Sequence, residues 1–187
     1  MDTKTNILPS GSGERAAMGG YLPQYDEFAC RVYDCILDKT LEEIRVADTE
    51  DNVGKLDDIC YVTKDEVHAY QVKWTTVDAN ITYLNFQEFL IGVVCGWKNL
   101  CKLYPHKHVI PHLLTNRTLS SQDQSLMNEN GERIGGFIDF CSEVIPALKE
   151  GRNVNAKWDK VIKDLQSNLK LENAEWRVFW KSFIFTA

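Results

Sequence analysis

Three polar residues near the middle of the chain have types and spacing suited to phosphate chemistry. The segment LDDICYVTKDEVHAYQVKW, residues 56–74, places Asp58 at the head of a short apolar run, and Gln71-Val72-Lys73 begins thirteen residues later. Strand alternation puts Gln71 and Lys73 on one face, with Val72 on the other. A tight hairpin would bring Asp58 alongside them. One carboxylate, one amide oxygen and one ammonium are therefore expected to converge.

This set of groups fits metal-assisted hydrolysis of a phosphodiester. Hard oxygen ligands hold Mg²⁺, which polarises the phosphate and activates water. A lysine beside the metal orients that water and offsets the developing negative charge. Spacing alone leaves a second interpretation open, in which Lys73 reaches solvent from a strand end and Asp57 and Asp58 only shape a turn.

Hydrophobic periodicity predicts the elements that would position these residues. Apolar residues at helical spacing predict a helix over 24–39, and branched residues predict a strand over 41–47. ICYV and VHAYQVKW predict a hairpin around the polar turn TKDE. A long buried helix is expected over 86–103, and a strand over 109–114 near an edge because of Pro111. Further helices are predicted over about 120–128, 135–149, 154–168 and 173–181, with Pro146 kinking or ending one, and a last strand over 183–185.

This order of elements predicts an α/β, three-layer fold built on a small mixed sheet with a helical C-terminal part. The 187 residues are 44% hydrophobic and 26% charged, which suits one soluble domain. Residues 1–20 are rich in Gly, Ser and Thr and predict a flexible segment before a domain over 21–187. No apolar run predicts a membrane span, and the start of the chain does not resemble a secretory signal. The six cysteines are interpreted as reduced core thiols of a cytoplasmic protein.

Charge is distributed unevenly along the chain. Residues 1–66 hold 15 Asp and Glu against 7 Lys and Arg, a net charge of −8, whereas residues 89–122 contain no acid. The acid-free stretch is a candidate DNA-contacting surface, and its basic residues are Lys98, Lys102, Lys107 and Arg117. It also contains His106, His108 and His112, whose spacing fits a zinc site less well than a strand entry or a DNA-facing patch. Four tryptophans at helical spacing are expected to pack in the core: Trp97, Trp158, Trp176 and Trp180.

Several stretches resemble the PD-(D/E)xK nuclease superfamily in its Q-x-K variant. They are GGYLPQYDEFA, the LDDI and YQVK core, LLTNRTLSS and the terminal EWRVFWKSFIF. The nearer resemblance is to double-stranded DNA nuclease effector domains of bacterial anti-phage systems, of the CD-NTase-associated and STAND (Avs) types. It implies a restriction-endonuclease-like fold with Asp58 as the metal aspartate at the strand head, or Asp57 as a fallback.

The same resemblance assigns roles to three more residues. Lys73 matches the catalytic lysine, Gln71 takes the position of the usual second acid, and Glu27 matches an additional metal-binding acid on the first helix. Gln71 departs from the commonest pattern because it is neutral, which leaves the site with one negative charge fewer. Glu27 would compensate.

The sequence therefore predicts a Mg²⁺-dependent endonuclease domain acting on double-stranded DNA, with Mn²⁺ as a substitute ion. By resemblance it would be a cytoplasmic anti-phage effector, without membrane association, fused to or regulated by a sensor or ATPase module. Double-strand cutting would use a dimer or larger homo-oligomer. Two alternatives stay open: a non-catalytic nucleic-acid-binding or oligomerisation module on the same fold, and an unrelated α/β interaction domain in which the three residues do not converge.

Overall fold

The computed structural model describes residues 25–26, 28–46, 56, 58–75 and 78–187. The segment predicted to be flexible, residues 1–20, lies outside these ranges, as do Glu27 and Asp57. The first helix covers residues 25–37, with residue 27 not described. The later elements are β1 (Leu41–Val46), β2 (Ile59–Thr63), β3 (Glu66–Lys73), β4 (Asn80–Ile81), α2 (Tyr83–Leu103), β5 (His108–Thr115), β6 (Thr118–Leu119), α3 (Phe137–Asp139), a π-helical turn (Phe140–Val144), α4 (Ile145–Glu150), a 3₁₀ turn (Ala156–Trp158), α5 (Asp159–Leu169), α6 (Asn173–Ser182) and β7 (Ile184–Thr186).

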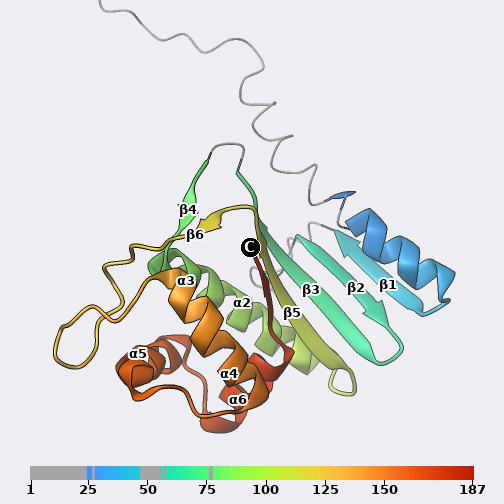
Figure 1. Ribbon diagram of the computed structural model, residues 1–187. Helices are drawn as coiled ribbons and strands as arrows, with labels where there is room; N and C mark the ends of the chain where they lie inside the picture. Colours follow the sequence, from blue (N-terminus) through green and yellow to red (C-terminus); the bar gives the residue numbers. More distant parts are fainter. Residues whose placement is uncertain (1–24, 27, 47–55, 57, 76–77) are drawn as a thin grey trace, which may run out of the picture.

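A five-stranded mixed sheet with the order β1-β2-β3-β5-β7 forms the middle of the molecule (Figure 1). β1, β2 and β3 pair antiparallel, whereas β3, β5 and β7 pair parallel. Parallel neighbours need a crossover connection, and α2 lies in the one between β3 and β5. β4 and β6 pair separately as a short two-stranded sheet.

Helices pack against both faces of the sheet, so the protein is a mixed α/β fold. On one face, the first helix packs through Phe28 and Cys35 onto a small cluster that includes Tyr61 and Tyr70. On the other face, α2 and the C-terminal helices enclose the main core, where Phe86 and Trp180 are fully buried. Alternation along β3 decides which face each side chain meets.

The long helix α2 has clear local reasons to form where it does. Thr82 caps its N-terminus by accepting from the Asn85 backbone N–H, and the Asn85 side chain accepts from the Thr82 backbone N–H. Buried residues recur at helical spacing from Tyr83 to Leu100 and face the core. Among the described helices, none combines the length and apolarity needed to cross a membrane.

The prediction of a strand near an edge is confirmed, because β5 is the second strand from the end of the sheet, between β3 and the short edge strand β7. Pro111 is tolerated there, since the pairing with β7 begins only at His112. The helix predicted over 120–128 was wrong, because these residues do not form a helix. The Asp123 side chain instead accepts hydrogen bonds from the backbone N–H groups of Tyr83 and Ser125, which favours an irregular turn.

Pro146 does not end its helix, but a change of helix type precedes it. The helical segment from Phe137 to Glu150 contains a π-helical turn, Phe140–Val144, immediately before α4. Proline offers no N–H to the carbonyl four residues earlier and clashes with it, so the wider turn accommodates its ring. The segment ends at Gly151, whose φ of 66° suits a helix terminus.

The cysteines and tryptophans behave differently. All six cysteines are free thiols, but only Cys60 is buried, whereas Cys30 and Cys95 are exposed, so the interpretation of all six as core residues was wrong. The packing role predicted for four tryptophans is confirmed, since Trp97, Trp158, Trp176 and Trp180 are all buried.

Candidate active site

The β2–β3 hairpin brings Asp58 and Gln71 into direct contact. Ile59 pairs with Tyr70 in the antiparallel register, so Asp58, one residue before β2, lies opposite Gln71. The Asp58 carboxylate accepts a hydrogen bond from the Gln71 side-chain amide and another from the Val72 backbone N–H at 2.7 Å. Gln71 is only 2% exposed. Two of the residues expected to converge therefore meet at the end of the hairpin.

Lys73 lies on the same face of β3 as Gln71. Strand alternation places Val67 and Ala69 on this face as well, and both pack in the core under α2. The Lys73 ammonium lies 5.7 Å from the ring centroid of Phe89 on α2. Attraction of the cation to the aromatic ring offsets part of the cost of holding a charge beside apolar groups.

A hydrogen-bonded clamp fixes the backbone around Lys73. The Thr115 hydroxyl donates to the Lys73 carbonyl at 2.8 Å. Asn116 pairs with Thr75 through both halves of its amide: its Oδ1 accepts from the Thr75 N–H at 2.9 Å, and its Nδ2 donates to the Thr75 carbonyl at 2.6 Å. Beyond the last backbone pair of β3 with β5, the Asn116 side chain therefore supplies the hydrogen bonds to Thr75. Sequence reasoning assigned no role to Thr115 or Asn116.

The donor set at this point fits a hard divalent cation as far as it is described. The Asp58 carboxylate and the Gln71 amide oxygen are ligand types preferred by Mg²⁺. The Gln71 amide would turn to present its oxygen, a choice that depends on the surrounding hydrogen bonds. Glu27 and Asp57 lie outside the described residues. Within the described ranges, no group of three or more His, Cys, Asp or Glu side chains has an arrangement that could hold a metal ion.

The four basic residues from the acid-free stretch do not share one location. Since α2 returns the chain from the end of β3 to the start of β5, its last turns lie at the opposite end of the sheet from Lys73. Lys98 and Lys102 are in that part of α2, and Lys107 directly precedes β5. Arg117, which follows β5, lies at the Lys73 end, and its Nε is buried without a hydrogen-bond partner among the described residues.

Two of the three distant lysines are engaged in structural contacts. Lys98 pairs with Glu175 at 2.9 Å. The Lys107 ammonium lies 2.8 Å from the Glu42 carboxylate and donates to the carbonyls of Thr63 and Lys64, so it fixes the β2–β3 turn.

The histidines form a chain on the face that carries the first helix. His112 Nε2 lies 3.1 Å from His68 Nδ1, and His68 Nε2 lies 3.1 Å from a Glu66 carboxylate oxygen. A carboxylate only accepts, so His68 carries its proton on Nε2 and accepts from His112 at Nδ1. Burial is the main reason that the pKa of His112 falls to about 3, and neighbouring His68 lowers it further.

The other two histidines have different surroundings. His108 Nε2 lies 2.8 Å from the Ser182 hydroxyl oxygen, and His106 is exposed. Sequence reasoning gave His68 no role, because its partner His112 is 44 residues away along the chain.

Comparison with known proteins does not assign the chain to a family: no family model matches it, and no curated protein does so. Function is therefore inferred from the arrangement of the side chains.

Proposed function

We propose that this protein is a metal-dependent endonuclease domain that hydrolyses phosphodiester bonds of double-stranded DNA, with a restriction-endonuclease-like fold of the PD-(D/E)xK type. The observation that carries the proposal is the contact of Asp58 with Gln71 across the β2–β3 hairpin, with Lys73 two residues further on the same face. Sequence spacing alone also allowed Lys73 and Asp58 to serve unrelated structural roles.

The chemistry follows from the properties of these groups. Asp58 and Gln71 would hold the cation, with Glu27 as a further acid. When bound, Mg²⁺ polarises a phosphate oxygen and lowers the pKa of a bound water. The Lys73 ammonium orients the attacking water and offsets negative charge that develops on the phosphate. Thr115 and Asn116 keep the Lys73 backbone in place, because they bond the carbonyls of Lys73 and Thr75.

The surroundings of the site suggest how DNA would approach it. Arg117 lies at the same end of the sheet as Lys73, so it can neutralise a phosphate near the cleavage point. Lys98, Lys102 and Lys107 lie at the other end. They contribute to DNA contact only where the duplex extends across the molecule.

The decisive experiment is cleavage of supercoiled plasmid with Mg²⁺. The wild-type chain should cut, and both Lys73→Ala and Asp58→Asn should lose at least about 100-fold in rate, a typical loss when a group that stabilises the transition state is removed. Asparagine is chosen because its amide oxygen still accepts from the Val72 N–H. Lys163→Ala serves as the control, since it removes one positive charge from the exposed surface of α5.

Cleavage at the wild-type rate by Lys73→Ala would remove the lysine from the mechanism. The alternative of a non-catalytic DNA-binding module predicts a different pattern. It requires DNA binding in EDTA that Lys73→Ala weakens, together with intact plasmid in the presence of either Mg²⁺ or Mn²⁺.

A further inference from the structure

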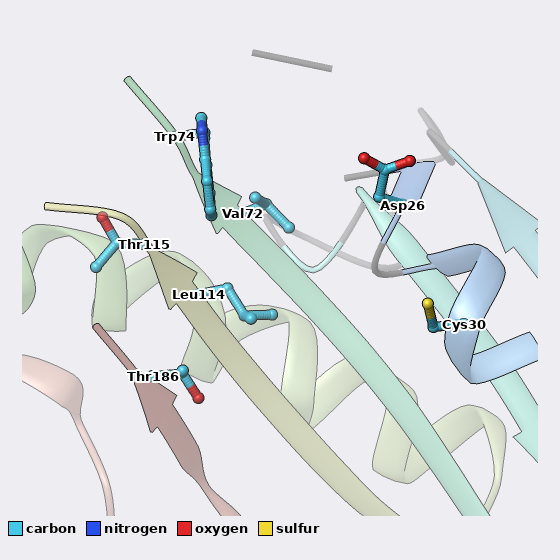
Figure 2. Close-up of a pocket in the computed structure, with 7 residues that line it drawn as sticks. All are labelled: Asp26, Cys30, Val72, Trp74, Leu114, Thr115 and Thr186. Atoms are coloured by element: carbon cyan, nitrogen blue, oxygen red, sulfur yellow. The ribbon is translucent and has the colours of Figure 1, made fainter. Parts of the chain in front are cut away.

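A pocket lies on the face of the sheet opposite Lys73 and Gln71, at the same end of β3. Its volume is about 520 Å³, within the range of roughly 300–1,000 Å³ that small-molecule sites occupy. Figure 2 shows residues of the first helix on one side and residues at the ends of β3, β5 and β7 on the other. Its lining includes the side chains of Asp26, Cys30, Val72, Trp74, Leu114 and Thr186.

Trp74 is the aromatic side chain of this pocket, and it is not used for packing. It is 39% exposed, whereas the other four tryptophans are buried. It belongs to neither of the two hydrophobic clusters. An exposed indole at the mouth of a pocket is a platform on which a flat ring can stack.

The remaining walls select a particular kind of flat ring. Val72 and Leu114 offer aliphatic surface, and the Thr186 hydroxyl can donate or accept a hydrogen bond. The Asp26 carboxylate only accepts, so it favours a ring that carries an amino group and repels a phosphate. An aromatic platform, aliphatic walls and an edge acceptor together match a nucleobase with an exocyclic amine.

The pocket shares residues with the proposed active site. The backbone N–H of Val72 bonds Asp58, while the Val72 side chain lines the pocket. Trp74 directly follows Lys73, and Thr115, which also lines the pocket, donates to the Lys73 carbonyl. A group bound in the pocket therefore lies at the same end of β3 as the groups that would hold the scissile phosphate, but on the other face of the sheet.

We infer that this pocket binds an unpaired nucleobase bearing an amino group, stacked on Trp74 and hydrogen-bonded to Asp26. If the proposed nuclease function holds, the base belongs to a nucleotide of the DNA that adjoins the phosphodiester being cut. That base leaves the duplex to reach the pocket. Base binding itself does not depend on catalysis. A free nucleotide would offer the same ring, so the two sources are separated by experiment.

The test measures tryptophan emission in EDTA, where no metal-dependent cleavage occurs. Hexamers of deoxyadenylate, deoxycytidylate and thymidylate, together with dAMP, are titrated into the wild-type chain. We expect saturable quenching that is stronger for the adenine and cytosine hexamers than for the thymine hexamer. Trp74→Phe should abolish the signal, since the four remaining tryptophans are buried. Asp26→Asn should remove the preference for amino-bearing bases.

Affinity and accessibility give two readouts that do not depend on fluorescence. By calorimetry, Trp74→Ala should weaken binding of the adenine hexamer by about tenfold, a loss typical of removing one stacking platform. In a Cys95→Ser background, bound hexamer should slow modification of Cys30, which lines the pocket.

Quenching that persists in Trp74→Phe, or the absence of saturable binding by every hexamer and by dAMP, overturns the inference. A hexamer of abasic residues that binds as tightly as the adenine hexamer overturns it as well. Binding of dAMP as tight as that of the hexamer supports the base pocket but assigns it to a free nucleotide. Failure of the nuclease function appears separately, as intact plasmid with Mg²⁺ while Trp74-dependent binding remains.

Discussion

At the scale of single residues, the pairing of Gln71 with Asp58 determines how the site responds to a change in charge. Gln71 is buried and donates to the Asp58 carboxylate, so the neutral amide stabilises that negative charge. A second carboxylate at this position would face the first one in a region with little water. Two such groups repel each other until a cation lies between them.

We therefore expect Gln71→Glu to lower stability without metal and to increase the response to metal. The free energy of unfolding in EDTA at pH 8 should fall by roughly 2 kcal/mol or more, and Mg²⁺ should restore it. Thermal unfolding with EDTA and with Mg²⁺ measures both effects. Gln71→Leu is the control, because it removes the hydrogen bond without adding charge. Equal Mg²⁺ responses in Gln71→Glu and wild type would contradict the metal site.

A second prediction for single residues concerns His112 and the loss of protein stability at acidic pH. Burial and the neighbouring His68, Arg31 and Lys149 lower the pKa of His112 from 6.5 to about 3, and burial lowers that of His68. Glu66 opposes the shift at His68. Below pH 6.5 the unfolded chain binds protons that the folded chain does not. The free energy of unfolding therefore falls as the pH decreases, by at most about 1.4 kcal/mol per pH unit for each such histidine.

Urea unfolding at pH 7, 6 and 5 tests this slope. His112→Phe keeps a ring to stack on Tyr70, whose ring centroid lies 4.0 Å from that of His112, and removes the titrating group. The loss of stability between pH 7 and 5 should be smaller in the variant than in wild type. Measurements are not taken below pH 5 because Glu143 and Glu175, whose pKa values are lowered, add their own acid dependence below pH 4.5. Exposed His106→Gln is the control, and parallel curves for wild type and His112→Phe would show that His112 does not cause the slope.

At the scale of elements, Lys107 connects three segments. Its ammonium bonds the Glu42 carboxylate on β1 and the carbonyls of Thr63 and Lys64 at the β2–β3 turn. Only 19% of the side chain is exposed. Lys107→Met should therefore lower the free energy of unfolding by about 1–3 kcal/mol, because it leaves these acceptors without their donor. Exposed Lys102→Met should change it by less than about 0.5 kcal/mol. Chemical denaturation of both variants distinguishes them, and equal stabilities would mean that the Lys107 contacts are not structural.

The sequence predicts local parts of this architecture better than distant ones. The β2–β3 hairpin follows from alternating apolar residues around a short polar turn, and its register places Asp58 opposite Gln71. The clamp formed by Thr115 and Asn116 joins segments about 40 residues apart, across the crossover through α2. No local pattern reports such a contact. The irregular segment 120–128 has the same origin, since its Asp123 bonds the first residue of α2.

The pocket beside Trp74 illustrates the same limit at the site. Its lining comes from the first helix and from the ends of three strands. Trp74 was visible in the sequence directly after Lys73, but only the fold shows that its indole stays outside the core. The basic residues of the acid-free stretch illustrate the opposite case. They lie close together in the sequence, but the fold places them at opposite ends of the sheet.

At the scale of the whole molecule, net charge opposes the proposed substrate. The chain carries a formal charge of −6, so its long-range field repels DNA. At the Lys73 end, Arg117 is the basic residue contributed by the acid-free stretch. A single copy should therefore bind DNA weakly, and its affinity should fall only modestly with salt, since few phosphate contacts release few counterions. Efficient cutting would then require several copies held on one duplex.

This reasoning predicts that linking two copies will raise cleavage more than doubling the concentration of one. A second active site tethered near the first acts at a high effective concentration without any new contact. Two sites, each cutting one strand, would also produce linear plasmid directly.

The measurement compares nicked and linear products over time for the single chain and for a version fused to a dimeric coiled coil, at equal concentrations of active sites. The fused Lys73→Ala variant is the control for cleavage by contaminants. We expect at least a tenfold gain in linear product at low protein concentration, in line with the gains that multivalency gives. A single chain that cuts in proportion to its concentration and gains nothing from fusion would show that one copy suffices, while leaving the chemistry at Asp58, Gln71 and Lys73 unaffected.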